Sequence, residues 1–217
     1  MRKQKRSFAQ RIILINFKKG MTRDIEKYFY HIKSVCPELT DVEFDQFSKG
    51  LTVSKFDKKD FYITSKKIQS KGGFIVEGLI RAFHTDELGN EKNIYFKAEN
   101  EYAFHYASFM LKKPCPLSFQ CIEPSIIINF PIDHIHKAYK EIPIFEKYGR
   151  IVTEQRANNQ QERLESLLYQ NSEQRYIDFT KQNPQLLNRI TISQLCSYLG
   201  VERQTLTRIR KKLTTQK

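Results

Sequence analysis

Residues 191–213 read TISQLCSYLGVERQTLTRIRKKL, and this stretch predicts two short helices joined by a tight turn. Thr191 and Gln194 fit a capping box that starts the first helix, and Gly200 fits its end. The apolar residues of the second helix recur at i, i+3 and i+7: Leu206, Ile209 and Leu213. Two short helices around a glycine-containing turn are typical of the helix-turn-helix.

The opposite face of the second helix is basic and polar. Arginine can pair with guanine O6 and N7, and glutamine with adenine N6 and N7, so this face is predicted to enter the major groove of double-stranded DNA. The residues on that face are Arg203, Gln204, Thr207, Arg208 and Lys211. Phosphate contacts are expected from Thr205, Thr207, Arg210, Lys211 and Lys212. A basic helical hairpin with a purely structural role is the alternative interpretation.

The distribution of charge favours the DNA interpretation. The chain of 217 residues has a formal net charge of +13. Residues 1–20 carry +7 and residues 172–217 carry +6, which leaves the body of the chain neutral. A neutral body with a basic C-terminal end indicates a localised polyanion site.

Composition excludes several other classes of protein. No apolar run approaches the length of about 20 residues that crosses a bilayer, and we expect a cytoplasmic protein. The cysteines contain no C-x-x-C pair, which argues against a zinc ribbon or an iron–sulfur cluster. They are Cys36, Cys115, Cys121 and Cys196, and we expect free thiols.

The middle of the chain is rich in short strands. Helical spacing marks residues 22–34, and Thr40 with Glu43 predicts the capped start of a second helix. From about 51 to 131, β-rich segments alternate with turns, among them the hairpin loop DELGNE at 86–91. This pattern predicts a small sandwich or barrel.

A long helix is expected over 141–170. Its apolar stripe supplies predicted contacts to a second copy of the chain: Ile144, Tyr148, Ile151 and Val152. The stretch TEQRANNQQER at 153–163 is polar all round, which is typical of a helix that bridges domains or pairs with a copy of itself. An ordinary core helix is the alternative.

These parts divide the chain into four predicted regions. They are a basic extension at 1–20, a β-barrel sensor at 21–140, a dimerisation or connecting helix at 141–170 and a DNA-binding region at 171–217. Met21 could serve as an alternative translation start.

The order of parts resembles the Crp/Fnr superfamily of bacterial transcription regulators, in particular the group common in Bacteroidetes. The resemblance covers about residues 21–217. It rests on SEQRYIDFTKQNPQLLNRITISQLCSYLGVERQTLTRIRKKL, GGFIVEGLIRAFHTDELGNEKNIYF and EIPIFEKYGRI. It implies an α+β fold: a cyclic-nucleotide-binding-type jelly roll, a dimerisation helix and a helix-turn-helix whose wing is reduced or absent. It also implies a homodimer on a pseudo-palindromic operator, with RNA polymerase as a further partner.

The resemblance also places an effector pocket. A cAMP-binding member has a Gly-Glu pair and, ten residues beyond the Glu, an Arg followed by a small residue. Here Phe104 and His105 take the places of the pair, and Cys115 and Pro116 take the later ones. A cyclic phosphate would lose its charge-assisted contact without the Arg. We therefore predict no cAMP binding in the usual mode and no cofactor; another ligand, or none, is expected.

The competing interpretation is a metal enzyme. His134, His136 and Glu141 are similar to the H-x-H and Glu ligands of cupin barrels. The stretch reads as a short helix leaving the barrel, where positions i and i+2 point to different faces. We predict no metal site, no catalytic residues and no enzymatic activity. A cupin-like ligand-binding or metal-dependent enzyme module with an incidental basic tail is the alternative.

Overall fold

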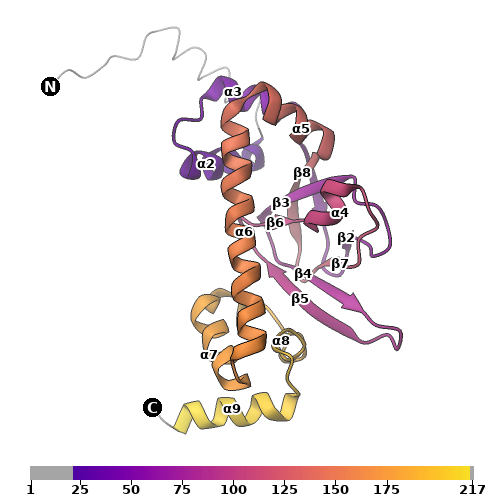
Figure 1. Cartoon of the computed structure of the whole chain (residues 1–217), viewed down its shortest axis with the longest axis vertical. Helices are drawn as coiled ribbons and strands as arrows, with labels where there is room; N and C mark the ends of the chain where they lie inside the picture. Colours follow the sequence, from indigo (N-terminus) through magenta and orange to yellow (C-terminus); the bar gives the residue numbers. More distant parts are fainter. Residues whose placement is uncertain (1–21, 216–217) are drawn as a thin grey trace, which may run out of the picture.

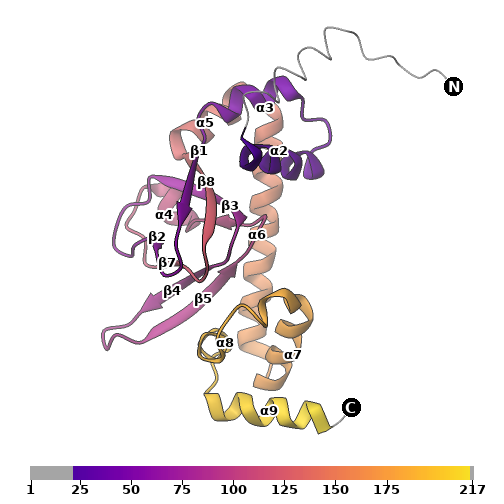
Figure 2. The same cartoon turned by 180° about the vertical axis from the view of Figure 1, so that it is seen from behind.

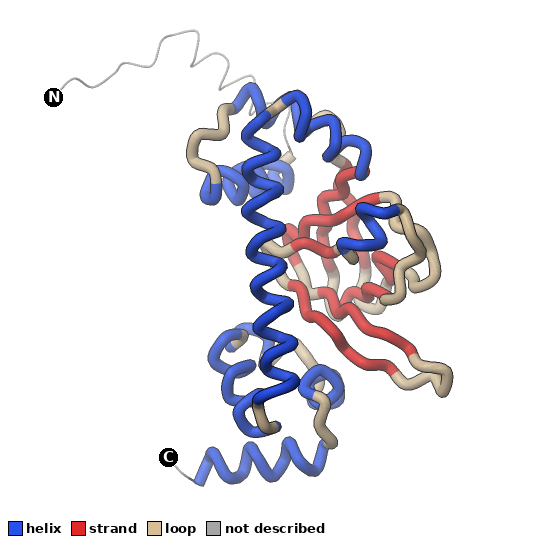
Figure 3. The backbone as a smooth tube through the Cα atoms, viewed as in Figure 1, coloured by secondary structure: helices blue, strands red, loops and turns tan. Residues whose placement is uncertain are grey.

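The structure is a computed structural model that describes residues 22–215. The predicted basic extension at 1–20 and the alternative start at Met21 lie outside the described residues. One long helix, α6 (Pro143–Tyr169), runs along most of the molecule, and the barrel lies beside it (Figures 1 and 2). Figure 3 shows that helices gather at both ends of α6, while the strands lie beside its middle.

The other helices fall into two groups along α6. Near its start lie α2 (Arg23–Val35), α3 (Asp41–Ser48) and α5 (Ile132–Glu141), and near its end lie α7 (Ser172–Gln182), η1 (Pro184–Leu186), α8 (Ile192–Leu199) and α9 (Arg203–Thr215). The short helix α4 (Tyr106–Leu111) belongs to the barrel. No helix in residues 22–215 is both long enough and apolar enough to cross a bilayer.

The strands form two antiparallel sheets that together make up the barrel. One sheet has the order β1 (Thr52–Phe56), β8 (Ser125–Pro131), β3 (Lys71–Glu77) and β6 (Tyr102–Ala103). The other has the order β2 (Phe61–Ile63), β7 (Ser118–Cys121), β4 (Ile80–Thr85) and β5 (Glu91–Lys97). Ile75, Ile127 and Phe119 from facing strands fill the interior. This arrangement confirms the predicted α+β jelly-roll fold.

The structure confirms the helix caps and the hairpin loop that were predicted from the sequence. The capping boxes at Thr40 and Thr191 both form, each with the side chain three residues later. Gly200 ends α8 in the left-handed region at φ +66°, which glycine adopts without a steric cost. The loop 86–90 closes the β4–β5 hairpin through the amide of Asp86, which donates to the carbonyl of Asn90 at 3.0 Å.

A chain of buried hydroxyl groups ties α2, β6 and α6 together. Tyr28 Oη lies 3.1 Å from Tyr102 Oη, which lies 2.5 Å from Tyr148 Oη. Burial raises the pKa of Tyr28 and of Tyr102, so both remain neutral. The surrounding cluster, called the α2–α6 cluster below, includes four residues of α2: Ile25, Tyr28, Phe29 and Ile32.

The residues predicted to contact a second copy lie largely within the chain's own core, and their role in a dimer remains a prediction. Ile144 and Tyr148 are only 9% and 5% exposed, because they pack against the chain's own α2–α6 cluster. Ile151 and Val152 are partly buried against the same cluster. The apolar residues that α6 leaves exposed lie near its end: Leu164, Leu167, Leu168 and Tyr169.

A separate cluster joins the barrel to the C-terminal helices. Leu79 and Phe96 of the barrel pack with Phe179, Leu199 and Leu206. The two regions therefore share buried surface, and the predicted division of the chain at 140 and 170 remains a prediction.

Candidate nucleic-acid interface

Helix α9 has one buried face and one exposed face. Leu206 and Ile209 are buried, and Leu213 is partly buried, as the spacing predicted. The exposed residues are Arg203, Gln204, Thr207, Arg208, Arg210, Lys211 and Lys212, while Thr205 is half-buried. Figure 1 shows α9 lying across the end of the molecule opposite α3. The helix therefore presents its basic side chains to solvent at one end.

Most of these cations have no carboxylate partner within residues 22–215. Arg208 Nη2 donates only to Thr205 Oγ1, at 3.4 Å. Lys212 is the exception, since its Nζ lies 2.7 Å from a Glu173 carboxylate oxygen on α7. The unpaired charges on Arg203, Arg208, Arg210 and Lys211 are available to an external polyanion.

Two arginines hold the end of α8 and so set the direction in which α9 leaves it. Arg175 Nε on α7 donates to the Leu199 carbonyl at 3.0 Å. Arg163 on α6 donates to the Tyr198 carbonyl, and its guanidinium lies 4.0 Å from the centre of that tyrosine ring. Cations at the last carbonyls of a helix satisfy free acceptors and oppose the negative end of its dipole.

Helix α8 is also hydrogen-bonded to the barrel. The Asn93 amide of β5 donates to Ser197 Oγ at 2.9 Å, and this hydroxyl donates to the Glu91 carbonyl at 2.9 Å. Asn93 Nδ2 donates to the Gln194 carbonyl at 3.3 Å. Strand β5 therefore fixes α8 on one side while the two arginines fix it on the other.

Arg189 makes a third link, from the loop before α8. Its Nη1 and Nη2 donate to the two carboxylate oxygens of Glu99 at 3.0 and 2.8 Å. Its Nε donates to Glu123 at 3.3 Å, and Nη2 also donates to that carboxylate. Burial raises the pKa of Glu99, but hydrogen bonds from Arg189 and from backbone amides outweigh it, and the pKa is lowered.

Sequence reasoning missed these three arginines. Arg163 lies in the stretch described as polar all round, seven residues after Arg156, and this spacing places both on one face of α6. That spacing could have marked Arg163 as a residue to consider. Arg175 and Arg189 had none, because Leu199 and Glu99, to which they bond, are 24 and 90 residues away in the chain.

The four positions expected to line an effector pocket lie in different surroundings. Ala103 faces the barrel interior, so the next residue, Phe104, points to the other face and joins the α2–α6 cluster. His105 Nδ1 accepts from the Ser108 amide at 3.3 Å and caps α4. Cys115 is buried in the barrel core, where burial raises the pKa of its thiol, and Pro116 is exposed. The predicted pocket remains a prediction.

The H-x-H pair of the metal-enzyme interpretation lies on helix α5, as expected. His134 Nε2 donates to the Phe47 carbonyl at 2.7 Å, whereas His136 is exposed. Within residues 22–215, no group of three His, Cys, Asp or Glu side chains is placed to hold a metal ion. All four cysteines are buried free thiols.

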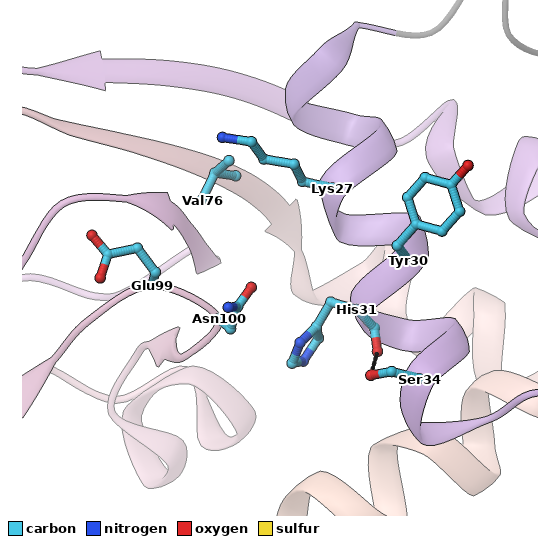
Figure 4. A pocket seen from close by; sticks show the side chains of 7 residues that line it. All are labelled: Lys27, Tyr30, His31, Ser34, Val76, Glu99 and Asn100. Carbon is cyan, nitrogen blue, oxygen red and sulfur yellow. Dashed lines mark hydrogen bonds between the residues drawn. The ribbon is translucent and has the colours of Figure 1, made fainter.

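A cavity of about 540 Å³ lies between one side of α2 and the barrel (Figure 4). It is lined by Lys27, Tyr30, His31, Ser34, Val76, Glu99 and Asn100. The Glu99 carboxylate is already bonded to Arg189 and to the Gly78 amide. Burial lowers the pKa of His31, which favours its neutral form. The acidic group of this cavity therefore serves a structural contact.

Solved structures of bacterial regulators share this architecture. FixK2 from Bradyrhizobium japonicum matches with a TM-score of 0.66 and 15% identity, over 76% of this chain and 85% of that one. The c-di-GMP responsive regulator CLP from Xanthomonas campestris matches at 0.66 and 9% identity, over 82% and 93%. A CooA mutant from Carboxydothermus hydrogenoformans matches at 0.65 and 14% identity, over 82% and 81%.

The fold is of the Crp/Fnr type. In a Crp/Fnr-type fold the barrel, the long helix and the C-terminal helices follow one another as they do here. No protein-family profile matches the sequence, and no curated protein matches it. At identities of 9–15% the likeness establishes the fold, and function depends on the site itself.

Proposed function

We propose that this protein is a homodimeric, sequence-specific DNA-binding regulator of the Crp/Fnr type, cytoplasmic and without enzymatic activity. The observation that carries the proposal is α9. Its apolar face is buried in the chain, and its opposite face presents cations of which only Lys212 has a carboxylate partner within residues 22–215. Such a helix can enter the major groove with its apolar face still packed.

Base reading is assigned to Arg203, Gln204 and Arg208, near the start of α9. The N-terminal part of a recognition helix contacts base edges, while more distant cations contact phosphates. Lys211 and Arg210 suit the phosphate role, since both are exposed and unpaired. Lys212 must first leave Glu173, so its contribution to DNA affinity is expected to be smaller.

The contact with a second copy of the chain is assigned to the C-terminal end of α6, where apolar residues are exposed. Leu164 and Leu168 are 57% and 65% exposed and lie four residues apart, on one face of the helix. Pairing two such faces would bury them and relate two α9 helices by a two-fold axis. A dimer of this kind reads half-sites about 34 Å apart on a pseudo-palindromic operator. Contact with RNA polymerase is a further expectation from the shared architecture.

Selection from a random pool of DNA duplexes tests the proposal. The expected result is an enriched pseudo-palindrome, bound by two chains. Arg203→Ala and Arg208→Ala should each weaken binding to the winner by about 1–3 kcal/mol and relax its sequence preference. Lys211→Ala should weaken all duplexes alike and reduce the slope of log K against log salt by about 1.

The matched control is Lys140→Ala, on the exposed surface of α5 at the other end of the molecule. It should leave binding to the selected duplex unchanged. A pool with no enriched sequence would overturn the base-reading assignment. So would Arg203 and Arg208 variants that keep the sequence specificity of the unaltered protein.

A further inference from the structure

Two segments of the barrel surface carry lysines and no acidic residue. Residues 61–71 and 102–120 together contain five lysines and neither aspartate nor glutamate. The lysines are Lys66, Lys67, Lys71, Lys112 and Lys113. Four of them are exposed and form two pairs, and each pair is adjacent in sequence to an apolar residue, Ile68 or Leu111, that is 61% exposed. Charge and exposed apolar surface therefore occur together.

Backbone hydrogen bonds hold the two segments side by side. The Lys66 amide donates to the Cys115 carbonyl at 2.7 Å, and the Cys115 amide donates to the Lys67 carbonyl at 2.9 Å. Ile68 and Pro114 pair in an antiparallel bridge. In an antiparallel pair, the residues that precede the bridge in the two segments lie at its opposite ends. The two lysine pairs therefore flank Ile68. We call this surface the lysine face: Lys66, Lys67, Ile68, Leu111, Lys112 and Lys113.

Side-chain contacts fix helix α4, which ends at Leu111, onto the same surface. The His105 amide donates to Gln69 Oε1 at 3.1 Å, just beyond Ile68. Ser108 Oγ on α4 donates to the Pro114 carbonyl at 3.2 Å. The apolar and basic side chains of the lysine face therefore project from a backbone that is already fixed.

The cations of the lysine face are largely unneutralised. Lys112 Nζ lies 3.2 Å from Asp133 Oδ1, but these two side chains are 60% and 81% exposed, and such pairs are weak. Lys66, Lys67 and Lys113 have no carboxylate partner within residues 22–215. Four cations against one carboxylate leave the face strongly positive.

Two of these lysines occupy positions at which the backbone favours glycine. Lys66 has φ +65° and Lys112 has φ +51°, in the left-handed region. That region carries a steric cost for a residue with a Cβ and none for glycine. The local fold therefore does not explain lysine at either position, and the exposed ammonium groups call for a partner.

The choice of lysine over arginine indicates the kind of partner. Specific protein interfaces are enriched in arginine and depleted in lysine. Arginine also supplies the rigid fork that recognises a single phosphate or base, and the exposed face of α9 carries three arginines. Lysine is a hydrated point charge on a flexible stem, which suits mobile anionic lipid headgroups. Exposed apolar side chains between such cations can enter the lipid interface.

We propose that the lysine face binds reversibly to the surface of a bilayer that contains anionic phospholipid. Ile68 and Leu111 enter the region between headgroups and acyl chains, and the lysines stay at the level of the headgroups. Helix α4 lies on the side of the barrel away from α6, whereas α9 crosses one end of the molecule (Figures 1 and 2). The lipid surface is therefore separate from the surface proposed for DNA.

A single introduced tryptophan tests the proposal, because the chain has none of its own. Residues 1–20 and α9 are also basic, so attraction of the whole protein to anionic vesicles does not identify the surface. Leu111→Trp places the reporter in the lysine face. Leu88→Trp, at an 88% exposed position in the β4–β5 hairpin loop, is the control.

Each full-length variant is titrated with vesicles of phosphatidylglycerol and phosphatidylcholine in equal parts, and with phosphatidylcholine alone. The fluorescence of Leu111→Trp should shift to the blue on the anionic vesicles and be quenched by lipids brominated on the upper acyl chain. The neutral vesicles should leave it unchanged, and Leu88→Trp should respond to neither.

Glycine variants test the charge without disturbing the backbone. In the Leu111→Trp protein, Lys66→Gly and Lys112→Gly should each weaken binding to the anionic vesicles about fivefold, which corresponds to about 1 kcal/mol per lysine near an anionic surface. The matched control is Lys59→Gly. Lys59 is exposed and also left-handed, at φ +79°, but its amide bonds to the Cys121 carbonyl, at the opposite end of β7 from Cys115. This control should leave vesicle affinity unchanged.

No blue shift at Leu111→Trp, or an equal shift at Leu88→Trp, would overturn the proposal. A shift on phosphatidylcholine alone would also overturn it, since charge would then play no part. So would a loss of affinity in Lys59→Gly equal to that in Lys66→Gly. Duplex selection uses no vesicles, so DNA recognition and lipid binding can each fail without the other.

Discussion

Replacing Arg189 with methionine removes the ion pairs between the loop before α8 and the barrel. Methionine keeps an unbranched apolar stem and discards the five donors. The guanidinium bonds to both oxygens of Glu99 and also to Glu123. The variant therefore tests whether this contact stabilises the packing of α8 and α9 against the barrel.

The magnitude follows from the exposure of the groups. The Arg189 side chain is 24% exposed, and the carboxylates of Glu99 and Glu123 are 36% and 31% exposed. Surface ion pairs contribute about 0–1 kcal/mol, and hydrogen bonds to charged groups about 1.5–3 kcal/mol. The two carboxylates can take up water in the variant, so we expect a loss of about 1–3 kcal/mol in the free energy of unfolding.

The loss should depend on pH. Because the folded pKa of Glu99 is lowered from the usual 4.5, its contribution is fully present above about pH 4.5 and is lost as the pH falls through the folded pKa. The difference in unfolding free energy between the natural protein and Arg189→Met should therefore be constant near pH 7 and shrink below pH 4.5. Urea unfolding followed by circular dichroism, repeated from pH 7 to pH 3, measures it.

The control is Lys147→Met, which removes an ion pair to Glu38 whose side chains are 46% and 51% exposed. That variant should change the unfolding free energy by less than about 0.5 kcal/mol. A loss of unfolding free energy below about 0.5 kcal/mol for Arg189→Met would refute the reasoning. A loss that does not vary with pH would also refute it.

Three further variants test other contacts by urea unfolding or sedimentation. Tyr102→Phe should cost about 1–2 kcal/mol, because it breaks the buried hydroxyl chain, whereas Tyr169→Phe at an exposed position should cost almost nothing; equal costs would contradict this. Gly200→Ala should cost about 1 kcal/mol from backbone strain alone, since nothing lies near the added methyl group; a neutral result would refute the strain argument. Leu168→Glu should shift the sedimentation of the protein from dimer towards monomer, and an unchanged dimer would move the proposed interface away from the end of α6.

The local structure could be predicted because its causes are local. The capping box at Thr191 and the left-handed end at Gly200 each involve residues within a few positions of one another. The burial of Leu206 and Ile209 follows from their helical spacing, so the exposed basic face of α9 was implied by the same pattern. The strands and turns of the barrel followed from similar short-range signals.

The partners of the apolar stripe on α6 could not be predicted in this way. An apolar stripe shows that a helix buries one face, but it does not show against what. Ile144 and Tyr148 are covered by α2 and β6, which come from distant parts of the chain. The apolar face that α6 leaves exposed is the one carrying Leu164 and Leu168.

The sequence by itself determined the kind of fold, the elements at its C-terminal end and the chemistry presented by α9, because these depend on spacing and charge along the chain. Only the tertiary structure decided which arginines hold α8, which face of α6 is free, and that Phe104 and Cys115 lie in different cores. Those features depend on which elements meet in space. Arg189 and Glu99 are 90 residues apart, and nothing near either residue in the sequence records their contact.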